Sequence, residues 1–503
     1  MPRRMSRELK TLSVLALSLA LNGCIGFGGI GPKGTMLAPN ALATDEAIQS
    51  AAQDANWPKA QWWNAYGDPQ LNDWISMAVQ GSPTMAMAAA RVRQAKAMAG
   101  VAESEESVQV TGGSTMKRHR WPSDQLYGPG DLDKATTWDN EASLGFSYSL
   151  DLWGMDSNTT EKAVDMAHMT AAEARQAQLE LQNNVIRAYI QLSLHYAQLD
   201  IIESTLHQQE QILELAQKRL DGGIGTYFEV SQAQAPLPEI HRKIDAQEEE
   251  IALTRNQLAA LAGKGPGEGA RLKRPTLVLG AALKLPSNLP AELLGQRPDV
   301  VASRWEVAAQ ARGIDVAHAG FYPNVNLMAS LGFVATGGGA LEFLTAKKLT
   351  YNVGPAISLP IFDGGRLRSE LGVASSGYDM AVAKYNQTLI NALKGISDQL
   401  IKRESMDKQQ VFAHESVEAA QKTYDIAMVA YQRGLTDYLN VLNAQTLLFQ
   451  QQQVQQVVEA ARLSAHAELV TALGGGLGAG NDVPKADRYA PDKPPAIMTM
   501  FSR

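Results

Sequence analysis

The sequence lacks features that define several common protein classes. It has one cysteine in 503 residues, so no disulfide can form within the chain. Its 45 basic residues are outnumbered by 52 acidic ones, which argues against a nucleic-acid partner, because phosphate binding needs a concentrated basic face. The eight histidines show no paired spacing of the kind that metal ligands have, and no catalytic set can be assembled. We therefore expect no cofactor, no metal and no enzyme activity.

The N-terminus carries a short apolar run at residues 12–21. It follows a basic start, is too short to span a membrane, and precedes small residues at which a protease could cut. Residues 1–23 are therefore interpreted as a secretory signal peptide.

The single cysteine, Cys24, ends the sequence Leu-Asn-Gly-Cys, which matches the bacterial lipobox. Cys24 is thus predicted to carry a lipid; the alternative, an unlipidated buried cysteine, leaves its position after the signal unexplained. Ile25 rather than aspartate follows, which by the bacterial sorting rule indicates the outer membrane. Residues 24–59 begin with a Gly-rich stretch and are interpreted as a lipidated flexible tether.

One stretch of the chain occurs twice. Residues 220–234 (LDGGIGTYFEVSQAQ) match residues 431–445 (YQRGLTDYLNVLNAQ) at a shift of 211, from Gln234 to Gln445. Such a shift is far longer than a solenoid period, so half of the protein repeats the other half. In each copy a glycine separates two helix-like runs, which is typical of a helical hairpin. We assign residues 60–263 and 295–473 to the two repeats, 264–294 to a connector and 474–503 to a Gly- and Pro-rich tail.

Four segments alternate between apolar and polar residues, two in each half. They are residues 108–115, 143–152, 324–333 and 351–361. A soluble β-sandwich strand would show the same pattern. Transmembrane β-strands also show it, over about 9 to 11 residues, with apolar side chains toward lipid and polar ones toward a lumen.

Long helices follow each pair of strands. From Val185, apolar residues recur every seven positions as far as Leu220, which predicts a coiled-coil seam. A helix over residues 157–220 would be about 95 Å long. Glu203, Glu210 and Gln217 interrupt the second apolar row, so this face meets water or a partner. Pro236 and Pro238 should kink the returning helix.

Four strands cannot close into a barrel, since small barrels need about eight. An open sheet in lipid would leave the polar groups of its edges without hydrogen bonds. If the strands enter a membrane, several chains must share one barrel, and the polar long helices must lie outside the membrane.

Several motifs then resemble one known family. They are the lipobox, R-P-D at residues 297–299, A-G-F-Y-P at 319–323, P-I-F-D-G-G at 360–365, and Y-x-x-G…L-N-A-Q over 431–445. Together they resemble the TolC-like outer-membrane factors of tripartite efflux pumps, of the NodT or OprM lipoprotein type. The resemblance implies a mainly α-helical fold with a membrane β-barrel, built as a homotrimer with a shared 12-stranded barrel and a periplasmic α-helical tunnel.

The resemblance also implies a function and partners. The chain would be the passive exit duct for drugs or toxic compounds in the outer membrane. An inner-membrane transporter of the RND, MFS or ABC type would deliver them through a periplasmic membrane-fusion adaptor.

The resemblance places the closed periplasmic mouth at the hairpin tips. In the family, aspartates near the second tip narrow the mouth and bind cations, and this chain has Asn440 and Asn443 at those positions. The remaining candidates for the aperture are the acids Asp437 and Glu229 and the aromatic residues Tyr227 and Tyr438. The candidates for adaptor contact are Gly223, Thr226, Gly434 and Thr436. The alternative for these residues is an exposed hairpin tip with no gating role.

Two other functions compete with the channel. A periplasmic coiled-coil adaptor or scaffold lipoprotein would explain the helices and the lipid but not the four strands. A lipid-anchored periplasmic enzyme would need an active site that the sequence does not reveal.

Overall fold

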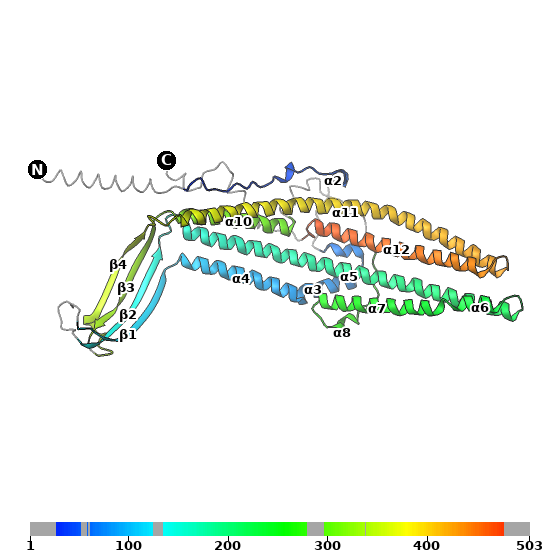
Figure 1. Ribbon diagram of the computed structural model, residues 1–503, viewed down its shortest axis with the longest axis horizontal. Coiled ribbons are helices and arrows are strands. Elements are labelled where there is room, and N and C mark those ends of the chain that lie inside the picture. Colours follow the sequence, from blue (N-terminus) through cyan, green and yellow to red (C-terminus); the bar gives the residue numbers. More distant parts are fainter. Residues whose placement is uncertain are drawn as a thin grey trace.

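The computed structural model describes residues 27–51, 58, 61–123, 134–278, 296–337 and 339–476. The molecule is elongated, with a β-sheet at one end and long helices running away from it (Figure 1). The first half contains α2 (Glu46–Ala51), α3 (Pro69–Gly81), α4 (Pro83–Glu105), β1 (Gln109–Arg120), β2 (Thr136–Ser149), α5 (Met155–Asp221), α6 (Tyr227–Gln234), α7 (Leu237–Leu261) and α8 (Pro266–Gly269). The second half contains α10 (Pro298–Ala319), β3 (Asn324–Thr336), β4 (Leu349–Ser358), α11 (Arg366–Gln432) and α12 (Tyr438–Ala472), and short 3-10 turns lie at Pro39–Ala41, Trp62–Tyr66 and Ala346–Lys348.

The strands form one antiparallel sheet in the order β1-β2-β3-β4, so β1 and β4 are its two edges. The register places Val110, Phe146, Ala329 and Val353 side by side, and most apolar residues of the four strands therefore share one face. This confirms the predicted alternation.

All four strands differ in extent from the prediction: β1, β2 and β3 reach farther toward the end of the sheet away from the helices, and β2 and β4 stop short of the prediction at the helical end. β2 ends at Ser149 instead of residue 152, because the carboxylate of Asp151 turns to accept backbone N–H bonds from Asp156 and Ser157 at the start of α5. β4 ends at Ser358 instead of residue 361, where Pro360 has no N–H to extend a ladder.

The repeat is visible in the two longest helices. α5 and α11 each have 67 residues, and both their first and their last residues differ by 211 in number. Each begins at a glycine with a left-handed backbone, Gly154 (φ 74°) and Gly365 (φ 92°). Both helices are about 100 Å long at 1.5 Å per residue. The predicted rod is therefore confirmed, a few residues longer than expected.

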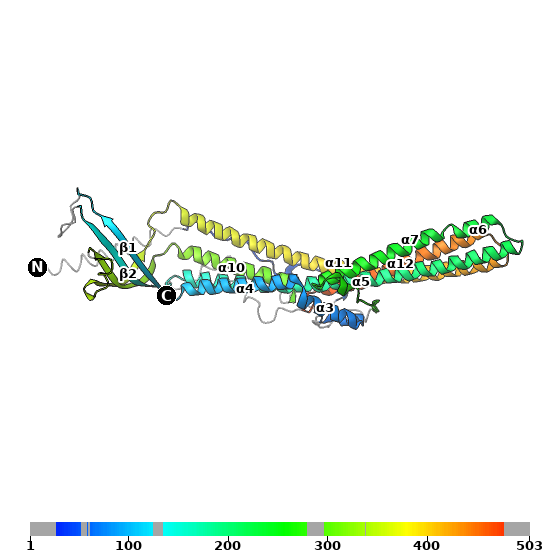
Figure 2. The ribbon, with the colours of Figure 1, turned by 90° about the horizontal axis from the view of Figure 1, so that it is seen from below.

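The helices lie side by side in a curved layer (Figures 1 and 2). α5 packs against α4 and α10 on the side toward the sheet and against α7 and α12 on the far side, while α11 packs against α10 and α12. The first half thus ends laterally at α4 and α7, and the second half at α11. Glu203, Glu210 and Gln217 of α5 are exposed to solvent in this layer.

An aromatic cluster anchors the middle of the rod. Trp62, Trp63 and Tyr66 are buried, and the Tyr66 hydroxyl donates a 2.8 Å hydrogen bond to the carbonyl oxygen of Leu463 in α12. Asp68 caps α3, and its carboxylate also accepts from the Tyr189 hydroxyl of α5 at 2.9 Å. These contacts join the first residues of the repeat to both halves of the molecule.

The segment over residues 27–51 differs from the expected flexible tether. It runs along α11, where the Asp379 carboxylate accepts the backbone N–H groups of Lys33 and Gly34 at 2.8 and 2.7 Å. Asn386 binds the backbone of Leu37, and Ile48 is buried against α11 and α12. The glycines predicted a flexible backbone, but side-chain hydrogen-bond acceptors more than 300 residues away in the sequence hold this backbone in place. Cys24 lies outside the described residues.

The prolines break the first hairpin as predicted: α6 ends at Gln234 and α7 begins at Leu237. Beside the break, the buried side chain of Gln209 in α5 donates from Nε2 to the carbonyl oxygen of Ala233, at 2.7 Å, and to the Tyr438 hydroxyl of α12, at 2.8 Å. Burial raises the pKa of Tyr438, and the Gln209 N–H opposes the rise. One amide thus joins three helices near the hairpin tips.

We predict that Tyr438→Phe weakens this junction, because it removes one of the two acceptors of a buried N–H donor. The local free energy of unfolding should fall by about 1 kcal/mol, so that amides of the first turns of α12 exchange hydrogen about fivefold faster. Tyr227 occupies the equivalent position in the first half but is 82% exposed. Tyr227→Phe is therefore the matched control, and equal exchange rates in the two variants would contradict the role of Gln209.

Candidate functional site

The two hairpin tips lie at the end of the molecule farthest from the sheet (Figures 1 and 2). Each turn depends on a left-handed glycine, Gly223 (φ 72°) and Gly434 (φ 73°). Each also closes with the same backbone bond, from Ile224 N–H to the Arg219 carbonyl at 3.0 Å and from Leu435 N–H to the Ala430 carbonyl at 2.9 Å. The turns are therefore copies of one another, and a residue with a Cβ would strain either of them.

The helices that leave the turns are capped by different residues at equivalent positions. In the first tip, Thr226 accepts from the Glu229 N–H at 3.2 Å, and the Glu229 carboxylate accepts from the Thr226 N–H at 3.3 Å. In the second, Asp437 accepts from both the backbone N–H and the side-chain amide of Asn440, at 3.2 and 3.0 Å. The amide of Asn440 also donates to Thr436 at 2.8 Å. Asp437 and Asn440 thus form one hydrogen-bonded unit.

The structure brings the predicted aperture residues to one end of the chain but gives them different surroundings. Asp437, Asn440 and Asn443 are exposed, and Glu229 is half-buried. Tyr438 is 2% exposed and packs near Tyr431, whereas Tyr227 is 82% exposed. Of the predicted adaptor contacts, Gly223, Thr226 and Gly434 are exposed and Thr436 is half-buried.

Two residues at the tips were not predicted. Arg219 of α5 lies over the Tyr431 ring of α11, with its guanidinium carbon 5.1 Å from the ring centroid, and so ties the two hairpins together. The other is Gln209, whose side-chain oxygen has no hydrogen-bond partner among the described residues. A signal for Gln209 exists in the sequence, because it stands seven residues from both Ile202 and Ala216, which are buried. A polar residue within a buried heptad row marks such a position.

The sheet has two chemically distinct faces. One carries mostly apolar side chains that are exposed in the single chain, among them Val110, Leu144, Tyr351, Val353 and Ile357. The opposite face carries mostly small and polar residues, including the register pair Lys117 and Asp139, with Met328 and Val334 of β3 as exceptions. Such a sheet suits a wall between lipid and a polar lumen.

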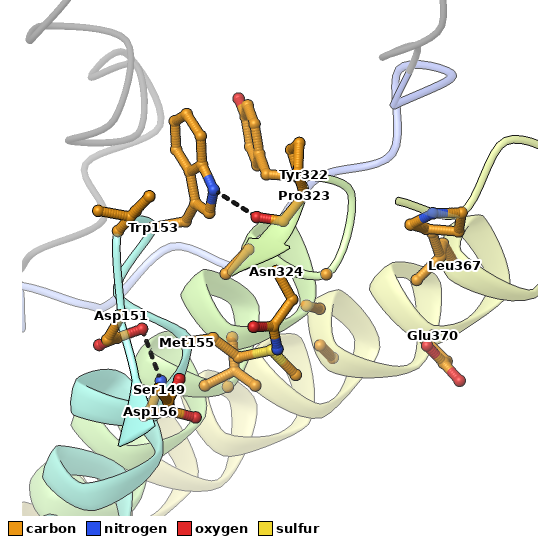
Figure 3. A pocket seen from close by; sticks show the side chains of 18 of the residues that line it. Ser149, Asp151, Trp153, Met155, Asp156, Tyr322, Pro323, Asn324, Leu367 and Glu370 are labelled. Atoms are coloured by element: carbon orange, nitrogen blue, oxygen red, sulfur yellow. Dashed lines mark hydrogen bonds between the residues drawn. The ribbon is translucent and has the colours of Figure 1, made fainter. Parts of the chain in front are cut away.

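A junction connects the sheet to the helices (Figure 3). The Trp153 indole donates a 2.8 Å bond to the carbonyl oxygen of Pro323 and stacks on the Tyr322 ring at 4.6 Å. A cavity of about 680 Å³ lies beside it, between the strand ends and α5, α10 and α11. The junction fixes the direction of the strands relative to the rod.

The described residues contain no group of three or more His, Cys, Asp and Glu side chains that could hold a metal ion. Within the same part of the chain, every helix is too short or too polar to cross a membrane.

Comparison with known proteins identifies the family. The family model described as outer membrane efflux protein matches residues 74–264 and 289–475. The fusaric acid resistance protein FusA of Burkholderia cepacia is 52% identical over 366 residues, covering 73% of this chain and 69% of that protein. The multidrug resistance outer membrane protein MdtP of Escherichia coli (strain K12) is 28% identical over 490 residues, covering 96% and 99%.

Solved structures agree with this assignment. The outer membrane protein VceC from Vibrio cholerae superimposes with a TM-score of 0.77 and 32% identity, over 84% of this chain and 100% of that one. The outer-membrane channel OprN gives a TM-score of 0.79 at 26% identity, over 88% and 99%. The predicted resemblance and outer-membrane location are thereby confirmed, and the adaptor or scaffold alternative is not supported. The chain belongs to the outer membrane efflux protein family.

Proposed function

We propose that three copies of this chain form one outer-membrane duct that passively conducts toxic compounds out of the cell. The observation that carries the proposal is the four-stranded sheet, which is apolar on one face, polar on the other and unpaired at both edges. In lipid, each unpaired backbone group of β1 and β4 would cost several kcal/mol. Three copies joined edge to edge remove these costs and give 12 strands, enough to enclose a lumen.

The helical layer supports the same closure. Its lateral helices keep large apolar side chains exposed in the single chain. They include Met87, Met98 and Val101 of α4 and Val373, Met380 and Phe412 of α11. A neighbouring copy that brings α11 beside α4 or α7 buries both rows and continues the layer into a tunnel.

Lipidation at Cys24 agrees with the docked N-terminal segment. Phe27, three residues later, packs edge-to-face on Phe321 with ring centroids 5.1 Å apart. Phe321 lies three residues before the start of β3, so the segment starts at the membrane side of the helical rod. A lipid on Cys24 would therefore reach the same membrane that holds the sheet.

The partners and cargo follow from the relatives. FusA is named for fusaric acid resistance and MdtP for multidrug resistance, so drugs or other toxic organic compounds are the proposed cargo. An inner-membrane transporter of the RND, MFS or ABC type supplies them through a periplasmic adaptor. The exposed turn residues Gly223, Thr226 and Gly434, together with Thr436, form the adaptor contact. The duct needs no catalysis of its own.

Membrane fractionation, semi-native gels and planar-bilayer recordings test this proposal. We expect the protein in the outer-membrane fraction, a trimer that dissociates only on heating, and discrete conductance steps after reconstitution. A soluble or inner-membrane monomer that produces no conductance would refute the duct.

We further propose that the tips narrow the periplasmic mouth. Asp437 and Asn440 bond to one another, and Asn443 offers a neutral amide, so hydrogen bonds and the packing of Tyr438 hold the mouth more than cation-bridged carboxylates do. Tyr227, exposed in the single chain, would add packing only against a neighbouring copy. Glu229 is occupied by its own capping box.

We predict that Asn440→Asp and Asn443→Asp make the conductance sensitive to divalent cations, because three copies then add rings of carboxylates to the mouth. Single-channel recording with added Mg²⁺ measures the effect. Asn391→Asp, on the exposed surface of α11, makes the same change of charge outside the tips. In this control variant, Mg²⁺ should block the conductance only as much as it does in the parent. Equal block in the parent and both tip variants would contradict this view of the mouth.

A further inference from the structure

The outer end of the sheet carries an unusual concentration of positive charge on both of its edges. β1 ends with Lys117, Arg118, His119 and Arg120, and Lys347 and Lys348 directly precede β4. All six residues are exposed. Because β1 and β4 run in opposite directions along the sheet, both basic segments lie at the same rim, which is the end away from the helices (Figure 1).

The basic residues of β1 have different neighbours on the two faces of the sheet. On the polar face, Lys117 lies in register with Asp139, and Glu141 follows on the same face. On the apolar face, Arg118 lies opposite Trp138 and Arg120 opposite Thr136. No acidic residue of the four strands lies on the apolar face. Acidic residues of β2 thus share the lumen face with Lys117, whereas no acidic residue of the strands shares the lipid face with Arg118 and Arg120.

No ion pair of the described residues involves Arg118, Arg120, Lys347 or Lys348. Within the described part of the chain, the Arg118 guanidinium carbon lies 5.9 Å from the centroid of the Trp138 ring. Glu342, in the loop before Lys347, is exposed and forms no ion pair with them. These four cations are available to an external anion.

Closure of the barrel makes the imbalance larger. When β1 of one copy pairs with β4 of the next, Arg118 and Arg120 approach Lys347 and Lys348 of the neighbouring copy at the rim. Like charges at such a seam repel, and the repulsion is strong where lipid excludes water. Each of the three seams therefore favours a counter-anion, since no acidic residue of the four strands lies on this face.

We propose that each seam binds a phosphate group of the phosphorylated glycolipid in the outer leaflet of the outer membrane. This inference rests on the proposed trimeric duct. Arginine pairs of this kind bind phosphate with short, charge-assisted hydrogen bonds. The site continues the apolar face without a break, so a phosphate carried by a lipid has its acyl chains beside Leu349, Tyr351 and Val353 of the same surface. The lipid bridges two copies and stabilises the trimer.

Thermal dissociation of the trimer in vesicles tests the proposal. The purified protein is reconstituted in phosphatidylcholine vesicles, with and without bisphosphorylated lipid A, and the dissociation midpoint is read from gels. Lipid A should raise the midpoint of the parent. A variant with R118Q, R120Q, K347Q and K348Q should have a higher midpoint than the parent in phosphatidylcholine alone, since the repulsion is gone, and should not respond to lipid A.

Lys117→Gln is the matched control, because it removes a cation from the same strand end on the lumen face. It should respond to lipid A as the parent does. Equal responses of the parent and the fourfold variant would overturn the site. If neither the parent nor the fourfold variant responds to lipid A, the site is also overturned. The charges would then serve to keep the strand edges from pairing prematurely. Full stabilisation by inorganic phosphate alone would overturn the assignment to lipid. A parent that forms no trimer in any vesicle would instead refute the proposed function.

Discussion

The backbone hydrogen bonds of β1 and β4 are the constraint on which the rest of this structure depends. A sheet with one apolar face and two open edges is unstable in water, because its apolar face is exposed there. It is also unstable in lipid, because the backbone groups of its edges find no hydrogen-bond partners. Association of copies around a common lumen places the apolar face in lipid and pairs the strand edges with each other. The long helices continue the same cylinder, because each strand pair passes into a helix through a short hydrogen-bonded junction such as that of Trp153 and Pro323.

The two halves of the chain are copies of one structural unit. The same shift of 211 residues relates the beginnings and the ends of α5 and α11, and the glycine turns at the tips. The two repeats differ at the hairpin tips, where they pack against each other. Tyr438 is buried and held by Gln209, whereas Tyr227 faces solvent. The second hairpin thus has a tightly packed tip, and the first one has a broken helix and an exposed aromatic residue.

Much of the fold could be predicted because it follows from periodicity. Alternation revealed the four strands, and the heptad repeat with its glycine breaks revealed the hairpins. The course of residues 27–51 could not be predicted, since it depends on Asp379 and Asn386, which are distant in sequence. The different burial of Tyr227 and Tyr438 was also hidden, because it arises from packing between hairpins. The strand ends near Asp151 and Pro360 were misplaced because capping and the missing proline N–H override alternation.

The most direct test of the account is whether β1 of one copy pairs with β4 of the next. In a Cys24→Ser background the chain has no other cysteine, so single cysteines can be introduced in pairs along the two edges, for example Thr111→Cys with Asn352→Cys. Oxidation in the membrane, followed by denaturing gels, measures the product. The account predicts covalent trimers for pairs in matching register and only monomers for either single variant. Monomers for every pair along both edges would contradict closure of a shared barrel.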